Sequence, residues 1–310
     1  MLLSILLCAL LCSDEISVSA YSPAPRKVPM RTDEVNLSRR TALAQLALVS
    51  STPLAAYAAE SSSVLETRLQ ENSITPPTYG MESAETDIFY PQYFKGSWKA
   101  ISKTKDIQAP CGLQLFTGGK AGFDSATQKE VIEGDTLQYR ARFIEQIRSD
   151  DSSSSYIAAD REFNSKEIAK AAMGDYSVVD VPIATPNRFS CVLAPPDGST
   201  NLICVDIITI ARKTEPLSAD KFACSEVVRQ IVSPAQRNNP NAPPVPPLSV
   251  KEIETISVYT KLSDDKIQCR QRTATYLVPS QSDPIAFKKW QLSQGNSVDV
   301  RCYDVLYSRI

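Results

Sequence analysis

A succession of extended segments is the feature that most constrains how this chain folds. Segments after residue 88 are rich in β-branched and aromatic residues and are bounded by turn-forming residues, which predicts strands joined by short turns. The segment 135–148 shows the pattern most clearly, because Tyr139, Ala141 and Phe143 alternate with polar residues, as a half-buried strand requires. Further strands are expected at 94–103, 156–163, 176–181, 188–193, 201–212, 221–232, 250–262, 266–278 and 298–307.

One short helix interrupts this series of expected strands. It is expected over residues 164–174, with Asn164 as its N-cap and Gly174 as its stop. About ten strands with one short helix predict an all-β protein with a single antiparallel up-and-down sheet of about 8–10 strands. Closing this sheet into a barrel removes its unpaired edges, whereas a two-sheet sandwich leaves edges that have to be protected.

The first expected strand contains Gly96, Ser97 and Trp98, a G-x-W pattern that resembles the first-strand signature of lipocalin-like (calycin) barrels. The resemblance implies a barrel closed at one end by Trp98. In such a closure the last strand ends beside the start of the first, so Arg309, or Arg301 earlier on that strand, is expected to stack on the Trp98 ring. An ordinary surface arginine is the alternative. The long connection 107–133 is expected to arch over the barrel mouth.

Several short motifs together resemble an uncharacterised family of cyanobacterial and plastid proteins, assigned to the thylakoid lumen and known as a domain of unknown function. The resemblance implies a location and a barrel, but no activity. The insert 234–247 and the cysteines depart from the family pattern. The motifs lie at residues 89–98, 159–164, 186–188, 225–230, 252–255 and 276–277.

Export signals precede the expected domain. Residues 1–20 have the apolar run and small-residue end of a signal peptide, and Arg39 and Arg40 precede a mild apolar segment with an Ala-Tyr-Ala site. Tyr21 resembles the aromatic start of transit peptides in red-lineage secondary plastids. The expected order is signal peptide 1–20, transit segment 21–37, twin-arginine thylakoid-lumen signal 38–58, flexible arm 59–87 and lipocalin-like barrel 88–310. A single signal peptide followed by a chance arginine pair is the alternative.

Composition excludes several classes of function. The formal net charge is −2 and no basic block is present, which argues against a nucleic-acid-binding protein. Histidine is absent, so hydrolases that use a serine–histidine or cysteine–histidine pair are excluded. The usual zinc and haem ligand is missing for the same reason. We therefore expect neither a metal nor a cofactor, and no residue is assigned a catalytic role.

Six cysteines follow the signal peptide, and an oxidising compartment makes disulfides plausible for them. A four-residue hairpin loop at 196–199 would place Cys191 directly opposite Cys204, close enough to form a bridge. The remaining pairs are expected to be Cys269 with Cys302 and Cys111 with Cys224. The alternative is that several are small buried free thiols.

Charged residues supply the candidate ligand contacts. Asp160 and Arg161 are expected either to orient a ligand head group at a cavity mouth or to anchor the corner between a strand and the helix. Arginines at two-residue spacing either line the interior as anion anchors or lie on a solvated face. Glu226 and Gln230 are expected to share one face of a strand. The candidate ligand-binding residues are Arg140, Asp160, Arg161, Arg272 and Tyr276.

Three functions are compatible with these features. The first is a non-catalytic thylakoid-lumen barrel that binds a small apolar or amphipathic molecule, such as a lipid, a pigment or a quinone-like compound. The second is a structural or assembly partner of a thylakoid membrane complex, with a filled barrel. The third is a lumenal lipocalin-like enzyme that acts on an isoprenoid. Cavity volume separates the first two, because a packed core leaves no space for a ligand.

Overall fold

The computed structural model describes residues 63–71, 74–79, 87–147, 155–173, 178–194, 202–235, 249–280 and 283–310. The predicted signal peptide, transit segment and twin-arginine signal lie outside these ranges, and so does the predicted hairpin loop 196–199. The structure therefore tests the β domain and part of the segment before it.

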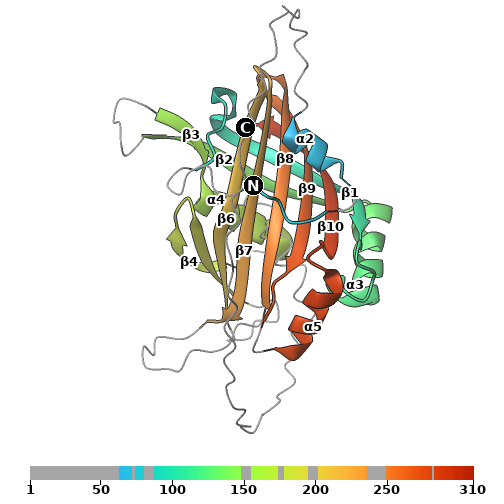
Figure 1. Cartoon of the computed structure of the whole chain (residues 1–310). Coiled ribbons are helices and arrows are strands. Elements are labelled where there is room, and N and C mark those ends of the chain that lie inside the picture. The colour runs from blue at the N-terminus through green and yellow to red at the C-terminus, as the bar shows by residue number, and fades with distance from the viewer. Residues whose placement is uncertain are drawn as a thin grey trace, which may run out of the picture. The chain divides into compact units, whose positions relative to one another are not determined.

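Ten strands form one sheet in which every neighbouring pair is antiparallel (Figure 1). Each predicted strand corresponds to one of them, which confirms the all-β class. Their order in the sheet is β3-β2-β1-β10-β9-β8-β7-β6-β5-β4. The strands are β1 Gly96–Gln108, β2 Thr136–Ile147, β3 Ser155–Ala159, β4 Val178–Ala184, β5 Arg188–Leu193, β6 Ile203–Ser218, β7 Lys221–Pro234, β8 Ser249–Ser263, β9 Lys266–Leu277 and β10 Asp299–Arg309.

The sheet is a curled half-barrel that does not close through hydrogen bonds. Its two edge strands, β3 and β4, are consecutive in the chain and are joined by the helix α4 (Arg161–Met173). Ile168 and Ala169 of α4 are fully buried and belong to the same apolar cluster as the concave face of the sheet. The closed barrel expected from the sequence is therefore not observed, because this helix packs where the two edges would have to pair.

More helices are present than the one expected. The predicted helix α4 begins three residues early, at Arg161, because the Asp160 carboxylate accepts a hydrogen bond from the Phe163 amide at 3.1 Å. Strand β3 consequently ends at Ala159 instead of extending to Phe163. Asn164, the expected N-cap, lies within the helix and is bound to the backbone of Arg142. The other helices are α2 Val64–Leu69, η2 Gln92–Phe94, α3 Gly119–Ala126, η3 Thr127–Ile132 and α5 Pro284–Ser293.

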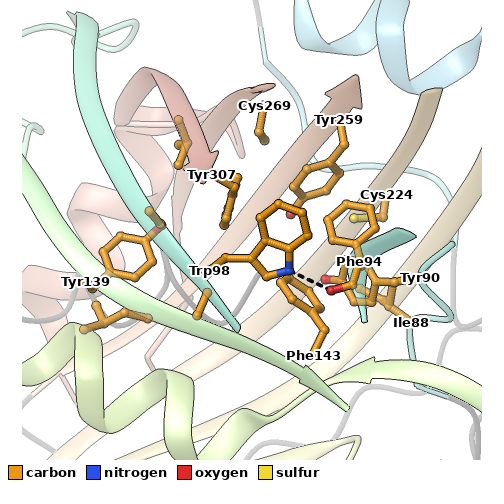
Figure 2. Close-up of a cluster of buried hydrophobic side chains, with 14 of the residues drawn as sticks. Ile88, Tyr90, Phe94, Trp98, Tyr139, Phe143, Cys224, Tyr259, Cys269 and Tyr307 are labelled. Atoms are coloured by element: carbon orange, nitrogen blue, oxygen red, sulfur yellow. Dashed lines mark hydrogen bonds between the residues drawn. The ribbon is translucent and has the colours of Figure 1, made fainter. Parts of the chain in front are cut away.

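Aromatic side chains fill one end of the concave face (Figure 2). Trp98 is fully buried, and its indole nitrogen donates a hydrogen bond to the Phe94 carbonyl at 2.7 Å. Tyr259 meets the Phe94 ring edge-on, at a centroid distance of 5.1 Å. Rings in this arrangement interact beyond their hydrophobic burial. This end of the sheet is a packed aromatic core.

The segment before the domain is ordered where the structure describes it. Leu65 of α2 and Ile74 are fully buried. They pack on the convex face of the sheet, against Ile256 and Ala274. The expected flexible arm 59–87 therefore contains a helix and covers part of the sheet.

Candidate functional site

A cavity of about 320 Å³ opens at the other end of the concave face. Its walls come from β1, β2 and β10 of the sheet, from α4, and from α3 and η3, which form part of the long connection between β1 and β2. We call it the covered pocket. The residues that line it are Ser102, Thr104, Thr117, Gly118, Gly122, Ser125, Ala126, Lys129, Glu130, Asp135, Thr136, Leu137, Ala171, Ala172, Arg301 and Tyr303.

The cover of this pocket depends on a glycine-rich start of α3. Gly118 has a positive φ of 75°, a conformation that favours glycine. A Cβ atom on Gly122 would lie 2.4 Å from the Thr117 carbonyl oxygen, so only glycine allows the helix to pack this closely on its own entry loop. The sequence therefore positions α3 over the pocket, as expected for a connection that arches over a mouth.

A π-helical turn, η3, brings an acid into the covered pocket. Glu130 accepts hydrogen bonds from Arg301 at 2.7 Å and from the Thr104 hydroxyl at 2.9 Å. Arg301 also donates to both carboxylate oxygens of Asp299, at 3.2 and 3.3 Å. π-Helical turns frequently occur at functional sites. Because the Arg301 guanidinium binds the carboxylates of both Glu130 and Asp299, its positive charge is neutralised at this corner of the pocket.

The remaining wall combines hydroxyl groups with small apolar side chains. Ser102 and Thr104 point from β1 into the same space as Tyr303 of β10, whereas Leu137 and Ala172 contribute apolar surface. Such a wall can hydrogen-bond a neutral oxygen of a ligand and pack against its hydrocarbon part. Ligand pockets span roughly 300–1,000 Å³, so the covered pocket is at the small end of that range.

The contact expected between Arg309 and Trp98 is present at the opposite end of the concave face. Arg309 pairs directly with Trp98 across β1 and β10, and its guanidinium lies over the indole ring at 4.3 Å. It also donates hydrogen bonds to the carbonyls of Lys95 and Tyr93. Gly96 has a φ of 122°, and a Cβ there would lie 2.9 Å from the Arg309 guanidinium. Gly96, Trp98 and Arg309 thus pack together as one unit. Arg301, the other arginine expected to reach Trp98, lines the covered pocket instead.

Arg161 takes part in a buried ion group next to the aromatic end. It pairs with Asp87 and lies 3.5 Å from Glu226, which also binds Arg212 at 2.6 Å. Burial opposes the charged form of Glu226, but the two arginines outweigh it and hold the pKa of Glu226 below its ordinary value. Arg161 therefore has a structural role here.

A second buried ion group lies on the convex face. Arg68 of α2 donates to both oxygens of Glu254, at 2.6 and 2.9 Å, and Arg272 lies 3.4 Å from the same carboxylate. Tyr276 donates to Glu254 at 3.3 Å. Arg272 and Tyr276 therefore bind the same carboxylate, which helps to attach residues 63–71 and 74–79 to the sheet.

The other two candidates flank α4 on the solvent side. Arg142 pairs with Asp160, and Arg140 binds Glu167 of α4 at 2.7 and 2.8 Å. Arg140 also lines a second, more open groove of about 450 Å³. Arg140 and Arg142 are not interior anion anchors, because the alternation of β2 places Tyr139 and Ala141 inside and these two arginines outside.

The six cysteines described by the structure are free thiols, so none of the expected disulfides is observed. The register of β5 and β6 places Val205 opposite Cys191 and Val192 opposite Cys204, one residue away from the predicted alignment. A slip of one residue turns the two thiols to opposite faces of the sheet. On β9 and β10, Val305 pairs with Cys269, which separates it from Cys302. Cys111 lies near Ser297, whereas Cys224 is buried in the aromatic core.

Sequence reasoning identified the cover of the pocket but not its wall. None of the five candidate ligand-binding residues lines the covered pocket. The residues that were missed are hydroxyl residues on the inward faces of β1 and β10, together with Glu130. The alternation of β1 indicates which side chains face inward, but the presence of an open space beside them depends on the packing of α3 and α4.

Among the residues that the structure describes, no group of three or more histidine, cysteine or acidic residues is placed to hold a metal ion. Within the same residues, no helix combines the length and apolarity that crossing a membrane requires.

Comparison with known proteins places the chain in a family. A family model described as a domain of unknown function (DUF6816) matches residues 82–295, which is more than half of the chain. The matched range contains most of the sheet and the whole cover of the pocket. No curated protein and no solved structure matches.

Proposed function

This chain belongs to the DUF6816 family, and from the geometry of its covered pocket we propose that it binds a small amphipathic molecule without transforming it. The observation that carries the proposal is a cavity of about 320 Å³ at the end of the concave face opposite the aromatic cluster. A cavity of this size accepts a ring or a head group, with the rest of a longer ligand extending through the mouth.

The chemistry of the wall defines the ligand class. Hydroxyl groups from Ser102 and Tyr303 offer hydrogen bonds, and Leu137 and Ala172 offer apolar contact. Arg301 is already bound to two carboxylates, so an acidic head group would have to displace Glu130 from it. A ligand with a neutral oxygen on an apolar skeleton leaves both carboxylates bound to Arg301. A lipid, a pigment or a quinone-like compound has this combination.

A second function is favoured by the opposite end of the sheet. The cluster around Trp98 and Tyr259 is filled, as expected for a structural or assembly partner of a membrane complex. This alternative predicts that nothing is bound in the covered pocket of the purified protein.

We further propose that the protein acts in the thylakoid lumen of a secondary plastid. The support is the order of the signals in the first 58 residues, with Arg39 and Arg40 before an apolar segment. A full-length fluorescent fusion should enter the plastid, and replacing both arginines with lysine should hold it in the stroma. Secretion of the fusion from the cell would contradict the plastid location.

The binding function can be tested by filling the pocket. Ala126 lies on α3 and lines the pocket, so Ala126→Trp should occupy the ligand space. Ala121 is exposed on the same helix and does not line the pocket, which makes Ala121→Trp the matched control. Native mass spectrometry of protein purified from its own membranes should show a bound small molecule in the wild type and in the control.

The expected result is loss of the bound mass in Ala126→Trp alone. An empty wild-type protein, after gentle purification and lipid extraction, would contradict the binding function and favour the assembly partner. Equal retention by all three proteins would show that the molecule binds elsewhere.

A further inference from the structure

Helix α5 (Pro284–Ser293) exposes more apolar surface than its packing requires. Asp283 caps it by accepting hydrogen bonds from the amides of Ile285 and Ala286, and a proline occupies the first turn. Ser293 is its only buried residue, so most of its circumference faces solvent. In Figure 1 the helix lies at the periphery of the sheet, beside the end of β9.

Two large apolar side chains occupy the solvent side of α5. Ile285 is 70% exposed and Leu292 is 59% exposed. At about 100° per residue they project within about 20° of each other, with Lys288 and Lys289 about 50° to either side. Phe287, which is 36% exposed, lies on the other side of the helix, where it packs on Trp290 at a centroid distance of 5.6 Å. The pattern is an apolar ridge flanked by two cations.

Helix α5 carries positive charge only. Lys288 and Lys289 are its only charged residues, and both side chains are exposed. Within the described ranges, neither lysine pairs with an acid. Asp283, the acid that directly precedes the helix, is engaged in its cap. The partner should therefore present negative charge over an apolar layer.

We propose that α5 docks this protein on the surface of an anionic lipid bilayer, with Ile285 and Leu292 in the acyl boundary and the lysines among the head groups. Interfacial helices combine apolar side chains with lysines in this way, and long lysine stems reach outward to the head groups. Basic residues close to an anionic surface strengthen such binding.

The size of the helix favours a bilayer over a protein partner. A helix of 10 residues is about 15 Å long. Stable protein interfaces bury roughly 800 Å² on each partner, far more than the exposed apolar side chains of one such helix provide. A bilayer surface needs only a few inserted side chains together with electrostatic attraction, and that is what α5 offers.

The position of α5 also relates docking to the covered pocket. The Cys111 thiol lies 3.3 Å from the Ser297 carbonyl and 3.7 Å from the Ser293 carbonyl. The connection that covers the pocket therefore touches the end of α5, so a bilayer at α5 would lie near the pocket cover. The docking proposal does not depend on the pocket being occupied.

Vesicle flotation tests the proposal with the full mature chain. The protein should float with vesicles of phosphatidylcholine and phosphatidylglycerol and much less with phosphatidylcholine alone, and added salt should reduce the difference. The pair Ile285→Ser and Leu292→Ser, and separately the pair Lys288→Glu and Lys289→Glu, should each lower the bound fraction by about tenfold or more.

Matched variants elsewhere control for general loss of apolar surface or positive charge. Leu262→Ser with Leu306→Ser removes side chains that are 54% and 38% exposed, and Lys103→Glu with Lys266→Glu reverses two exposed lysines. Both should bind like the wild type, and circular dichroism should show that all variants fold. Wild-type protein that does not float with anionic vesicles would overturn the proposal. So would α5 variants that float like the wild type, or a stable complex of α5 with an acidic protein in place of the bilayer.

Discussion

Along the inward face of β1, Trp98 and Ala100 are followed by Ser102 and Thr104, and the character of the interior changes with them. Trp98 lies under Arg309 within a packed aromatic cluster, whereas Ser102 and Thr104 face a cavity. The alternation of the strand is identical at both ends, so it does not distinguish a plug from a pocket. The chemical nature of the inward residues does, and this contrast can be tested by substitution at each end.

The largest expected effect is at the aromatic end. Trp98→Ala removes a fully buried side chain and should lower the free energy of unfolding by about 3–5 kcal/mol through the cavity that it leaves. The chain contains one other tryptophan, Trp290, which is only partly buried on α5. Trp290→Ala should therefore cost well under half as much in urea unfolding. Similar losses for both variants would contradict the view that Trp98 plugs a packed end.

The buried ion group gives a second large effect at the same end. Glu226→Ala leaves Arg161 and Arg212 without their shared carboxylate, which should cost about 3–5 kcal/mol of unfolding free energy. Glu252 on the neighbouring strand pairs with Arg229 near the surface, so Glu252→Ala should cost about 1 kcal/mol or less. Chemical denaturation measures the loss of unfolding free energy in both variants. Equal losses would show that the buried ion group contributes no more to stability than the surface pair.

The same carboxylate predicts how stability responds to acid. The pKa of Glu226 is lower in the folded protein than its ordinary value, so its contribution is present in full above the pKa of the unfolded chain. That contribution is lost as the pH falls through the folded pKa. In Glu226→Gln, the free energy of unfolding should therefore depend less on pH below about 4.5 than in the wild type. Identical slopes in both proteins would rule out a titrating role for this group.

The strands were predictable from sequence because each has a local signal. Arg188–Leu193 has the predicted bounds, and the inward set Tyr139, Ala141 and Phe143 follows from alternation alone. The pairing of Arg309 with Trp98 was also predictable from sequence, because the end of the last strand lies beside the start of the first in a curled antiparallel sheet. These features depend on local patterns or on simple topology.

What could not be predicted depends on contacts between distant segments. Helix α3 contains glycines and buries none of its residues, so only its position over the sheet shows its role. Arg272 was expected either inside the barrel or on a solvated face, but α2 covers it on the convex face. The pairing of Cys191 with Val205 differs from the predicted register by one residue, because the exact loop length decides which thiol faces inward.

The smallest effect on stability is expected at the pocket end, where binding should change instead. Ser102 lies on the pocket wall, so Ser102→Ala should alter the free energy of unfolding by about 0.5 kcal/mol or less. If its hydroxyl binds the proposed ligand, retention should weaken by about fivefold, which corresponds to one hydrogen bond of about 1 kcal/mol. Ser97→Ala, on the opposite face of the same strand, should change neither quantity. Native mass spectrometry at increasing activation energy compares retention among the three proteins. A strong loss of stability in Ser102→Ala with unchanged retention would mean that this end of the sheet, like the aromatic end, is built for packing alone.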